Sequence, residues 1–306
     1  MKGGIPHRHT VETTRPTTPA SVQQQGLPTT GRWLLWIVFL ALLLCANMAQ
    51  AQGLAPLPTK GREFWMGYMQ NAYGAQELRV QIASQNGTSG TVSTPRTGWS
   101  SAFTVAANGV TTLIVPVGNE HTGSEVLSDK GVLIQANDSV TVSLESFQSF
   151  TTDGAQVFPT EALGTSYRAQ SYRGLPGFAD FYKSELLIVA TQDDTEIEIV
   201  PSVNTSGGRA AGVPFIVSLD AGQSYQVQSA LASLDVTGTT VRATTSSGPC
   251  RPFAVFSGSM CANVPAGCPA CDHIVEQMVS TDRWGQNFHT IPLTGAITHT
   301  YRILAD

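Results

Sequence analysis

The stretch Leu187-Ile-Val-Ala-Thr-Gln-Asp-Asp-Thr-Glu-Ile-Glu-Ile-Val200 decides the fold class. Apolar and polar residues alternate in its second half, and Asp193-Asp194 supplies the turn residues before it. Successive side chains of a strand point to opposite faces of a sheet, so this alternation predicts a strand with one buried face. We therefore expect a hairpin turn at Asp193-Asp194.

The same stretch gathers four carboxylates, from Asp193, Asp194, Glu196 and Glu198. Calcium takes such oxygen-rich sets. However, two of the carboxylates fall at the expected turn, and the other two share the solvent face of the expected strand. We expect an exposed, polar face and no metal site.

Similar alternating runs recur from residue 60 onward, separated by turn residues. The runs are Leu78–Ile82, Phe103–Val105, Val132–Ile134, Val140–Leu144 and Tyr225–Gln228, and the turns are Asn86-Gly87, Asn108-Gly109, Asn137-Asp138 and Ala221-Gly222. This pattern predicts an all-β chain of strands and hairpins. One segment, Asp272–Met278, is a candidate short helix with Asp272 as its N-cap.

A repeat is visible along the chain. Gly61-Arg-Glu-Phe64, Gly164-Thr-Ser-Tyr167 and Gly285-Gln-Asn-Phe288 share a start, and Ile82-Ala-Ser-Gln-Asn86 matches Val189-Ala-Thr-Gln-Asp193. Ile303-Leu-Ala-Asp306 begins a third copy. A unit of roughly 105–120 residues is too long for one propeller blade and suits a small antiparallel sandwich. We expect tandem β-sandwich-like repeats at 61–160 and 161–281, with the start of a third, truncated unit at 282–306. A propeller-like arrangement is the alternative.

The N-terminus reads as an export signal. A polar segment precedes the apolar run Trp33–Ala46, which is shorter than the ~20 residues of a membrane span. Ala49-Gln-Ala51 supplies a small-x-small cleavage pattern, so residues 1–51 read as a signal peptide and 52–60 as a linker. An uncleaved anchor and a lipoprotein on Cys45 are the alternatives. We expect a secreted or cell-surface protein without a membrane span in its mature chain.

Charge excludes one class of partner. Charged residues make up 13% of the chain, and the formal net charge is −5. No basic stripe could follow a phosphate backbone, so we expect no nucleic-acid partner.

Four cysteines remain after signal cleavage: Cys250, Cys261, Cys268 and Cys271. Cys268-Pro-Ala-Cys271 is half of a zinc knuckle, which Cys261 and His273 could complete, and a C-x-x-C before a possible helix is also typical of redox motifs. The zinc pattern lacks a second hook, and the redox motif wants a βαβ frame. An even count in an exported protein favours disulfides, and we predict the pairs Cys261–Cys271 and Cys250–Cys268.

Catalytic signals are weak. His273 and Glu276 would share one face of the expected helix, where a metal or acid/base pair is conceivable, but local hydrogen bonding is the better interpretation. No Gly-x-Ser-x-Gly elbow, Walker loop or His-Glu-x-x-His occurs. We expect no catalytic residues, no metal and no cofactor.

Several motifs follow one another in the second half of the chain. They are Pro159-Thr-Glu-Ala-Leu-Gly-Thr-Ser-Tyr167, Leu187–Glu196, Leu219-Asp-Ala-Gly-Gln-Ser-Tyr-Gln226, Pro252-Phe-Ala-Val-Phe-Ser-Gly258, Cys261-Ala-Asn-Val-Pro265, Cys271-Asp-His-Ile-Val-Glu-Gln277, Trp284-Gly-Gln-Asn-Phe288 and Tyr301-Arg-Ile-Leu-Ala305. Together they resemble the N-terminal domain family of the IgGFc-binding protein, strongly from Pro159 onward and more weakly before it.

This resemblance implies a secreted, non-catalytic binding module. It also supports the Cys261–Cys271 pair, since the family has cysteines at both places, while Cys250 and Cys268 look like additions. We expect an extracellular adhesion module that binds a protein or a glycan. The alternative is an accessory region of a secreted hydrolase. Loops on a rigid β-scaffold are the usual recognition sites, and the candidate contact residues here are Tyr172, Phe178, Phe181 and Tyr182.

Overall fold

The computed structural model describes residues 57–177, 180–244, 251–264, 267, 270–292, 294–295 and 301–305. They belong to one compact unit, Pro56–Asp306. The described residues form an all-β structure, in which helix is confined to the 3₁₀ turns η1 (Val117–Asn119), η2 (Thr160–Ala162) and η3 (Thr281–Arg283). Within these residues, no helix has the length and apolar character needed to cross a membrane.

The described residues form sixteen strands. In chain order they are β1 (Gly61–Met66), β2 (Glu77–Ser84), β3 (Thr88–Thr94), β4 (Trp99–Val105), β5 (Gly109–Val115), β6 (Leu127–Ser128), β7 (Val132–Phe147), β8 (Asp153–Val157), β9 (Ser166–Arg168), β10 (Ser184–Ala190), β11 (Thr195–Val200), β12 (Phe215–Leu219), β13 (Ser224–Gln228), β14 (Thr240–Ala243), β15 (Phe253–Ala262) and β16 (Asp272–Gln277).

The first strand set, β1–β5 with β7 and β8, forms two antiparallel layers joined by one long strand. The beginning of β7 pairs with β1 and β3, and β3 pairs with β4. The remainder of β7 pairs with β2 and β8, and β2 pairs with β5. Because β7 takes part in both layers, the first set forms one connected sheet of seven strands.

The second strand set, β9–β16, repeats this pairing order. One sheet runs β12-β11-β14-β9, and the other runs β16-β15-β10-β13, with β6 added at the edge of β13. Thus β14 and β15 make the pairs that the two parts of β7 make in the first set. The shared order supports the predicted repeat, whose boundaries near residues 61–160 and 161–281 stay a prediction.

Residues that the sequence match pairs do not always point to the same side of their sheets. Ala83 lies on β2 and Ala190 on β10, which have the same place in the pairing order. Ala190 belongs to the core of the second set, whereas on β2 it is the neighbour Ile82 that faces the core. The inward-pointing residue of β10 is therefore one position further along the matched motif than the inward-pointing residue of β2.

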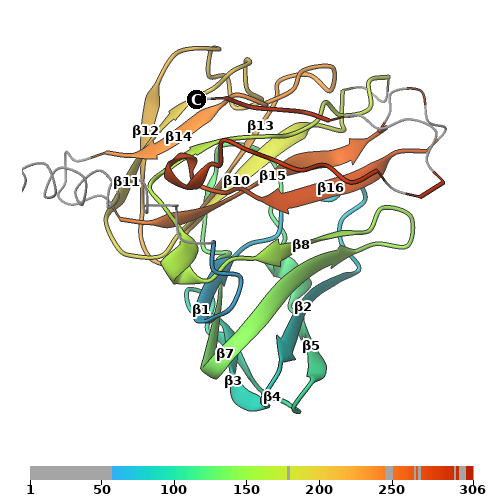
Figure 1. Cartoon of the computed structure of the whole chain (residues 1–306). Helices are drawn as coiled ribbons and strands as arrows, with labels where there is room; N and C mark the ends of the chain where they lie inside the picture. The colour runs from blue at the N-terminus through green and yellow to red at the C-terminus, as the bar shows by residue number, and fades with distance from the viewer. Residues whose placement is uncertain are drawn as a thin grey trace, which may run out of the picture. The chain divides into compact units, whose positions relative to one another are not determined.

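The sheet that contains β10 is buried on both faces, which explains why every residue of β10 is buried. Leu186 and Ile188 face the core of the second set, while Leu187 and Val189 join the core of the first set. Figure 1 shows β10, β15 and β16 between β11, β12 and β14 on one side and β1 and β8 on the other. This burial joins the two strand sets along the face of one sheet.

Three local predictions were wrong. Asp272–Met278 is not a helix: residues 272–277 form β16, where His273, Val275 and Gln277 alternate inward. Asn137-Asp138 does not reverse the chain, because β7 continues through it. Asp193-Asp194 does form a turn, but it links β10 to β11 in a different sheet and is not a hairpin. Glu196 and Glu198 do share the outer face of β11, as expected.

Candidate binding surface

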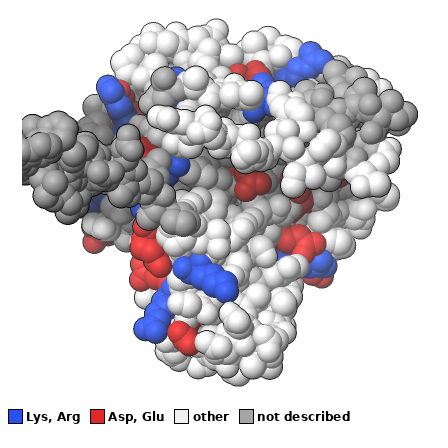
Figure 2. Space-filling view, in the orientation of Figure 1, with Lys and Arg blue, Asp and Glu red and all other residues white. Residues whose placement is uncertain are grey.

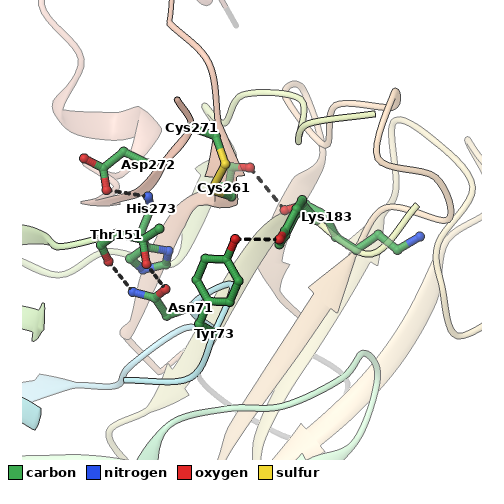
Figure 3. The surroundings of a disulfide bond; sticks show 10 residues. Asn71, Tyr73, Thr151, Lys183, Cys261, Cys271, Asp272 and His273 are labelled. Carbon is green, nitrogen blue, oxygen red and sulfur yellow. Dashed lines mark hydrogen bonds between the residues drawn. A yellow bond between two sulfur atoms is a disulfide. The ribbon is translucent and has the colours of Figure 1, made fainter. Parts of the chain in front are cut away.

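A disulfide joins the ends of two paired strands. Cys261 lies near the end of β15, Cys271 lies just before β16, and their sulfur atoms are 2.03 Å apart. The bond, shown in Figure 3, closes the connection between the two strands. It confirms the predicted Cys261–Cys271 pair and occupies two of the thiols that a zinc or redox site would need. Cys250 and Cys268 lie outside the described residues.

The segment before β10 folds back onto this disulfide. The Leu175 amide donates to the Cys261 carbonyl oxygen at 3.0 Å. Gly174 lies directly against the main-chain carbonyl of Tyr182, which leaves no room for a side chain. Ala72, Tyr182 and Cys261 form a small apolar cluster here, with Leu175 and Cys271 packed against it.

Aromatic side chains cover the cluster. The hydroxyl of Tyr182 donates to that of Tyr73 at 3.0 Å, and their ring centroids are 6.1 Å apart. Phe181 meets Tyr182 edge-on at 5.4 Å. Tyr182 is buried, but Tyr73 is 61% exposed and Phe181 51% exposed. We call Tyr73, Leu175, Phe181, Tyr182 and the Cys261–Cys271 bond the tyrosine–disulfide surface.

The four aromatics of the predicted contact set differ in their surroundings, and their role in binding stays a prediction. Tyr182 supports the surface from beneath and does not project from it. Tyr172 is half-buried and lies under the guanidinium of Arg302, and Phe178 lies outside the described residues. Only Phe181 of the four is both described and more than half exposed. Tyr73, from the segment that follows β1, contacts the same Tyr182 ring as Phe181 and is not among the four.

A small cavity opens within the same two loops. Its volume is about 220 Å³, and it is lined by Arg173, Gly174, Leu175, Pro176, Asn263 and Gly267. Arg173 is exposed. Lys183, next to Tyr182, donates from its ammonium to the Ala230 carbonyl at 2.6 Å, and burial lowers its pKa. The cavity therefore combines an apolar lining with a nearby positive charge.

A buried carboxylate fixes the segment that carries Tyr73. Glu120 accepts the Asn71 amide on one oxygen at 2.7 Å and the Ala75 amide on the other at 2.8 Å. Burial raises the pKa of Glu120, and these hydrogen bonds oppose that rise. The side-chain amide of Asn71 also donates to the Thr151 carbonyl at 2.6 Å, a contact visible in Figure 3. Tyr73 is thus presented on a turn that is held at both ends.

His273 and Glu276 do not form the conceivable metal or acid/base pair. In β16 they fall on opposite faces, His273 buried and Glu276 exposed. The His273 ring nitrogens face the Ser259 and Met260 carbonyls without a well-aligned hydrogen bond, and burial lowers its pKa to about 4. In the part of the chain that the structure describes, no group of three or more His, Cys, Asp or Glu side chains could hold a metal ion.

Charge is sparse on the surface. On the face shown in Figure 2, side chains of both signs are scattered among uncharged residues. The described residues that are visible there form no continuous basic stripe.

The described residues thus place an aromatic surface and a disulfide together on an all-β scaffold. A family model described as IgGFc binding protein matches residues 153–306, and the chain belongs to this family. The human IgGFc-binding protein is 26% identical over 264 residues, which cover 84% of this chain and 5% of the human protein. The chain thus corresponds to a small part of that relative. No solved structure matches.

Proposed function

We propose that this chain is a non-catalytic module of a secreted or cell-surface protein that holds a protein partner through the tyrosine–disulfide surface. One observation carries the proposal: Tyr73 and Phe181 are exposed although both contact the buried ring of Tyr182. Large exposed aromatics on a rigid support are typical of interface hot spots.

The support lowers the cost of binding. The disulfide, the Leu175–Cys261 hydrogen bond and the Glu120 carboxylate each restrain a loop that carries part of the surface. A partner would therefore lose little free energy in ordering these loops, which is the usual gain from preorganisation. The apolar cavity beside Arg173 could take one side chain of the partner.

The first partner to test is the Fc part of IgG, because the human relative is named for binding it. An apolar cavity and exposed aromatic rings suit a protein surface that offers an apolar side chain near a carboxylate. Export is part of the proposal, and it predicts that secreted material begins at Gln52.

Biolayer interferometry with the exported protein would test the proposal. Fc, F(ab′)2 fragments and mucin glycans serve as separate analytes. Phe181→Ala and Tyr73→Ala should each raise the Kd for the true partner about tenfold or more. Ile216→Ala is the matched control, since Ile216 is 56% exposed on β12. If a partner binds equally well to all four proteins, another surface is responsible. Binding to glycans alone would replace the protein partner, and hydrolysis of a tested polymer would favour the enzyme alternative.

A further inference from the structure

The second strand set packs on the segment that follows β1. A Cβ atom built on Gly67 would stand 2.9 Å from a methyl group of Leu187 and 3.1 Å from one of Val189. The amide of Gln70 donates to the side-chain oxygen of Gln226 at 3.1 Å. Leu187 of β10 thus lies directly on the chain just beyond the end of β1.

The matching segment of the second set follows β9. The shared starts place Phe64 opposite Tyr167, so that Gly67 corresponds to Gln170. Gln170 also touches residue 302, because its side-chain amide donates to the Arg302 carbonyl at 2.9 Å. The Arg302 guanidinium donates to the Ser171 carbonyl and lies 5.1 Å from the ring centroid of Tyr172.

Arg302 also corresponds to Leu187 by sequence. Tyr301-Arg-Ile-Leu-Ala305 aligns with Leu186-Leu-Ile-Val-Ala190 when the two alanines are matched. The residue of β10 that lies on Gly67 and the residue that lies beside Gln170 therefore have the same place in the motif. Two independent matches, one on each side of the contact, lead to the same pair of positions.

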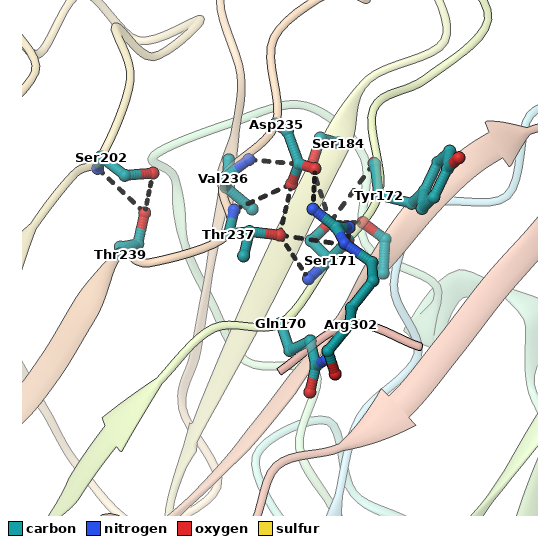
Figure 4. A network of polar contacts seen from close by, with 11 residues as sticks. Gln170, Ser171, Tyr172, Ser184, Ser202, Asp235, Val236, Thr237, Thr239 and Arg302 are labelled. Carbon is teal, nitrogen blue, oxygen red and sulfur yellow. Dashed lines mark hydrogen bonds and ion pairs between the residues drawn. The ribbon is translucent and has the colours of Figure 1, made fainter. Parts of the chain in front are cut away.

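The residues that bind Arg302 are also held to one another by hydrogen bonds. Asp235 binds the guanidinium at 2.8 Å and also accepts the Thr237 hydroxyl at 2.6 Å. The Thr237 hydroxyl in turn contacts the Ser171 amide at 2.9 Å and the Ser171 carbonyl at 3.1 Å. Figure 4 shows this network converging on Arg302. Its parts come from the segments after β9 and after β13, and both are fixed by contacts of their own.

We propose that Gln170–Tyr172 with Asp235 is a seat for the first inner strand of a further β unit of the same pattern, fastened by an arginine at the place of Arg302. The exposure of residues 301–305 supports this occupant. Ile303 is 88% exposed, whereas its counterpart Ile188 is fully buried by neighbouring strands. An apolar strand face of this kind fits a unit that brings its own second sheet. The inference rests on the predicted repeat and is independent of the proposed binding function.

The test uses the whole chain with Arg302→Gln, which removes the guanidinium that Asp235 binds. A capped peptide Tyr-Arg-Ile-Leu-Ala is titrated while backbone amide shifts are followed by NMR. We expect saturable shifts at residues 170–172 and 235–237, and an affinity about tenfold lower or worse when Asp235→Asn is added. Arg283→Gln is the control variant, because Arg283 also donates to a carbonyl but lies outside the network.

A second peptide tests whether the site accepts other strands with an arginine at this position or only the sequence of residues 301–305. It carries residues 184–190 with Leu187→Arg, and it should shift the same amides. If neither peptide binds, or if Asp235→Asn has no effect, the seat does not exist as proposed. If only Tyr-Arg-Ile-Leu-Ala binds, the site accepts that tail alone and the stacking proposal fails. IgG binding is not measured in this experiment, so a failure of the proposed binding function would not change its result.

Discussion

Gly174 lies so close to Tyr182 that a Cβ atom added to it would stand 1.7 Å from the Tyr182 carbonyl oxygen. No side-chain rotation can relieve this contact, because the main chain fixes the position of a Cβ atom and the atom that it meets is a main-chain oxygen. The two ends of the loop that carries Phe181 meet at this point. Glycine at residue 174 is therefore a condition for the tyrosine–disulfide surface.

Gly174→Ala should destabilise the protein by about 1–3 kcal/mol, because the loop must move away from Tyr182. Urea unfolding measures the loss, and the affinity for the partner should fall with it. Gly177→Ala is a useful comparison, since nothing lies within 4 Å of a Cβ at Gly177, although its positive φ costs some strain. Equal stability of wild type and Gly174→Ala would mean that the loop is not packed as described.

Removal of the disulfide should cost about 2–3 kcal/mol. The two cysteines are 10 residues apart, and closing a short loop limits the unfolded chain by about this amount. The double variant Cys261→Ala/Cys271→Ala tests this by urea unfolding without reductant. Reductant should destabilise the wild type more than the variant, because only the wild type has the Cys261–Cys271 bond to lose. A variant as stable as the oxidised wild type would show that the Cys261–Cys271 bond does not stabilise the protein.

Glu185→Gln should stabilise the protein at pH 8 more than at pH 5. Glu185 is fully buried, and desolvation raises its pKa well above 4.5, with the Glu120 charge adding and the Gln228 hydrogen bond opposing. A raised folded-state pKa stabilises fully below the unfolded pKa, and that stability is lost as pH rises through the folded pKa. The gain at pH 8 should be about 1–3 kcal/mol, as for relief of a poorly paired buried group.

Urea midpoints at both pH values measure this effect. Glu198→Gln on the outer face of β11 serves as the control. The prediction fails if Glu185→Gln and wild type show the same dependence on pH.

The protein should lose stability in mild acid. Burial lowers the pKa of His273 from 6.5 to about 4, so the folded state binds this proton less readily than the unfolded state does. Stability therefore falls as pH falls below 6.5, by about 2 kcal/mol between pH 6.5 and pH 4.5 for this one group. His121, whose pKa burial lowers to about 3, adds in the same direction.

His273→Leu should remove the share that comes from His273. Urea unfolding from pH 7 to pH 4.5 would show a shallower acid decline for the variant than for the wild type. His289→Leu is the control, since His289 is exposed. An unchanged decline in His273→Leu would assign the acid sensitivity to other groups.

Local periodicity predicted most of the strands but could not predict which faces would be buried twice. Ser184–Ala190 is entirely buried because its sheet lies between two cores, and that is a property of the assembled chain. The short helix was predicted at Asp272 because an acidic residue preceded apolar ones. Pairing with β15 overrode that local preference and made the segment a strand.

The residues of the tyrosine–disulfide surface were predicted only in part. The cysteine pair and Phe181 come from one region of sequence, where local reasoning works. Tyr73 lies 109 positions from Tyr182 in the sequence and contacts it through a hydrogen bond. No pattern of residue spacing predicts this contact. Only the fold brings such residues together, and the packing of the Leu175 segment decides that Tyr182 is the buried partner and Phe181 the exposed one.

Strand β7 passes from one layer of the first set to the other without a break. A pulling force on the first set would be carried along a single continuous backbone and shared by the ladders with β1, β2, β3 and β8. The first set should therefore yield as one unit under such a force.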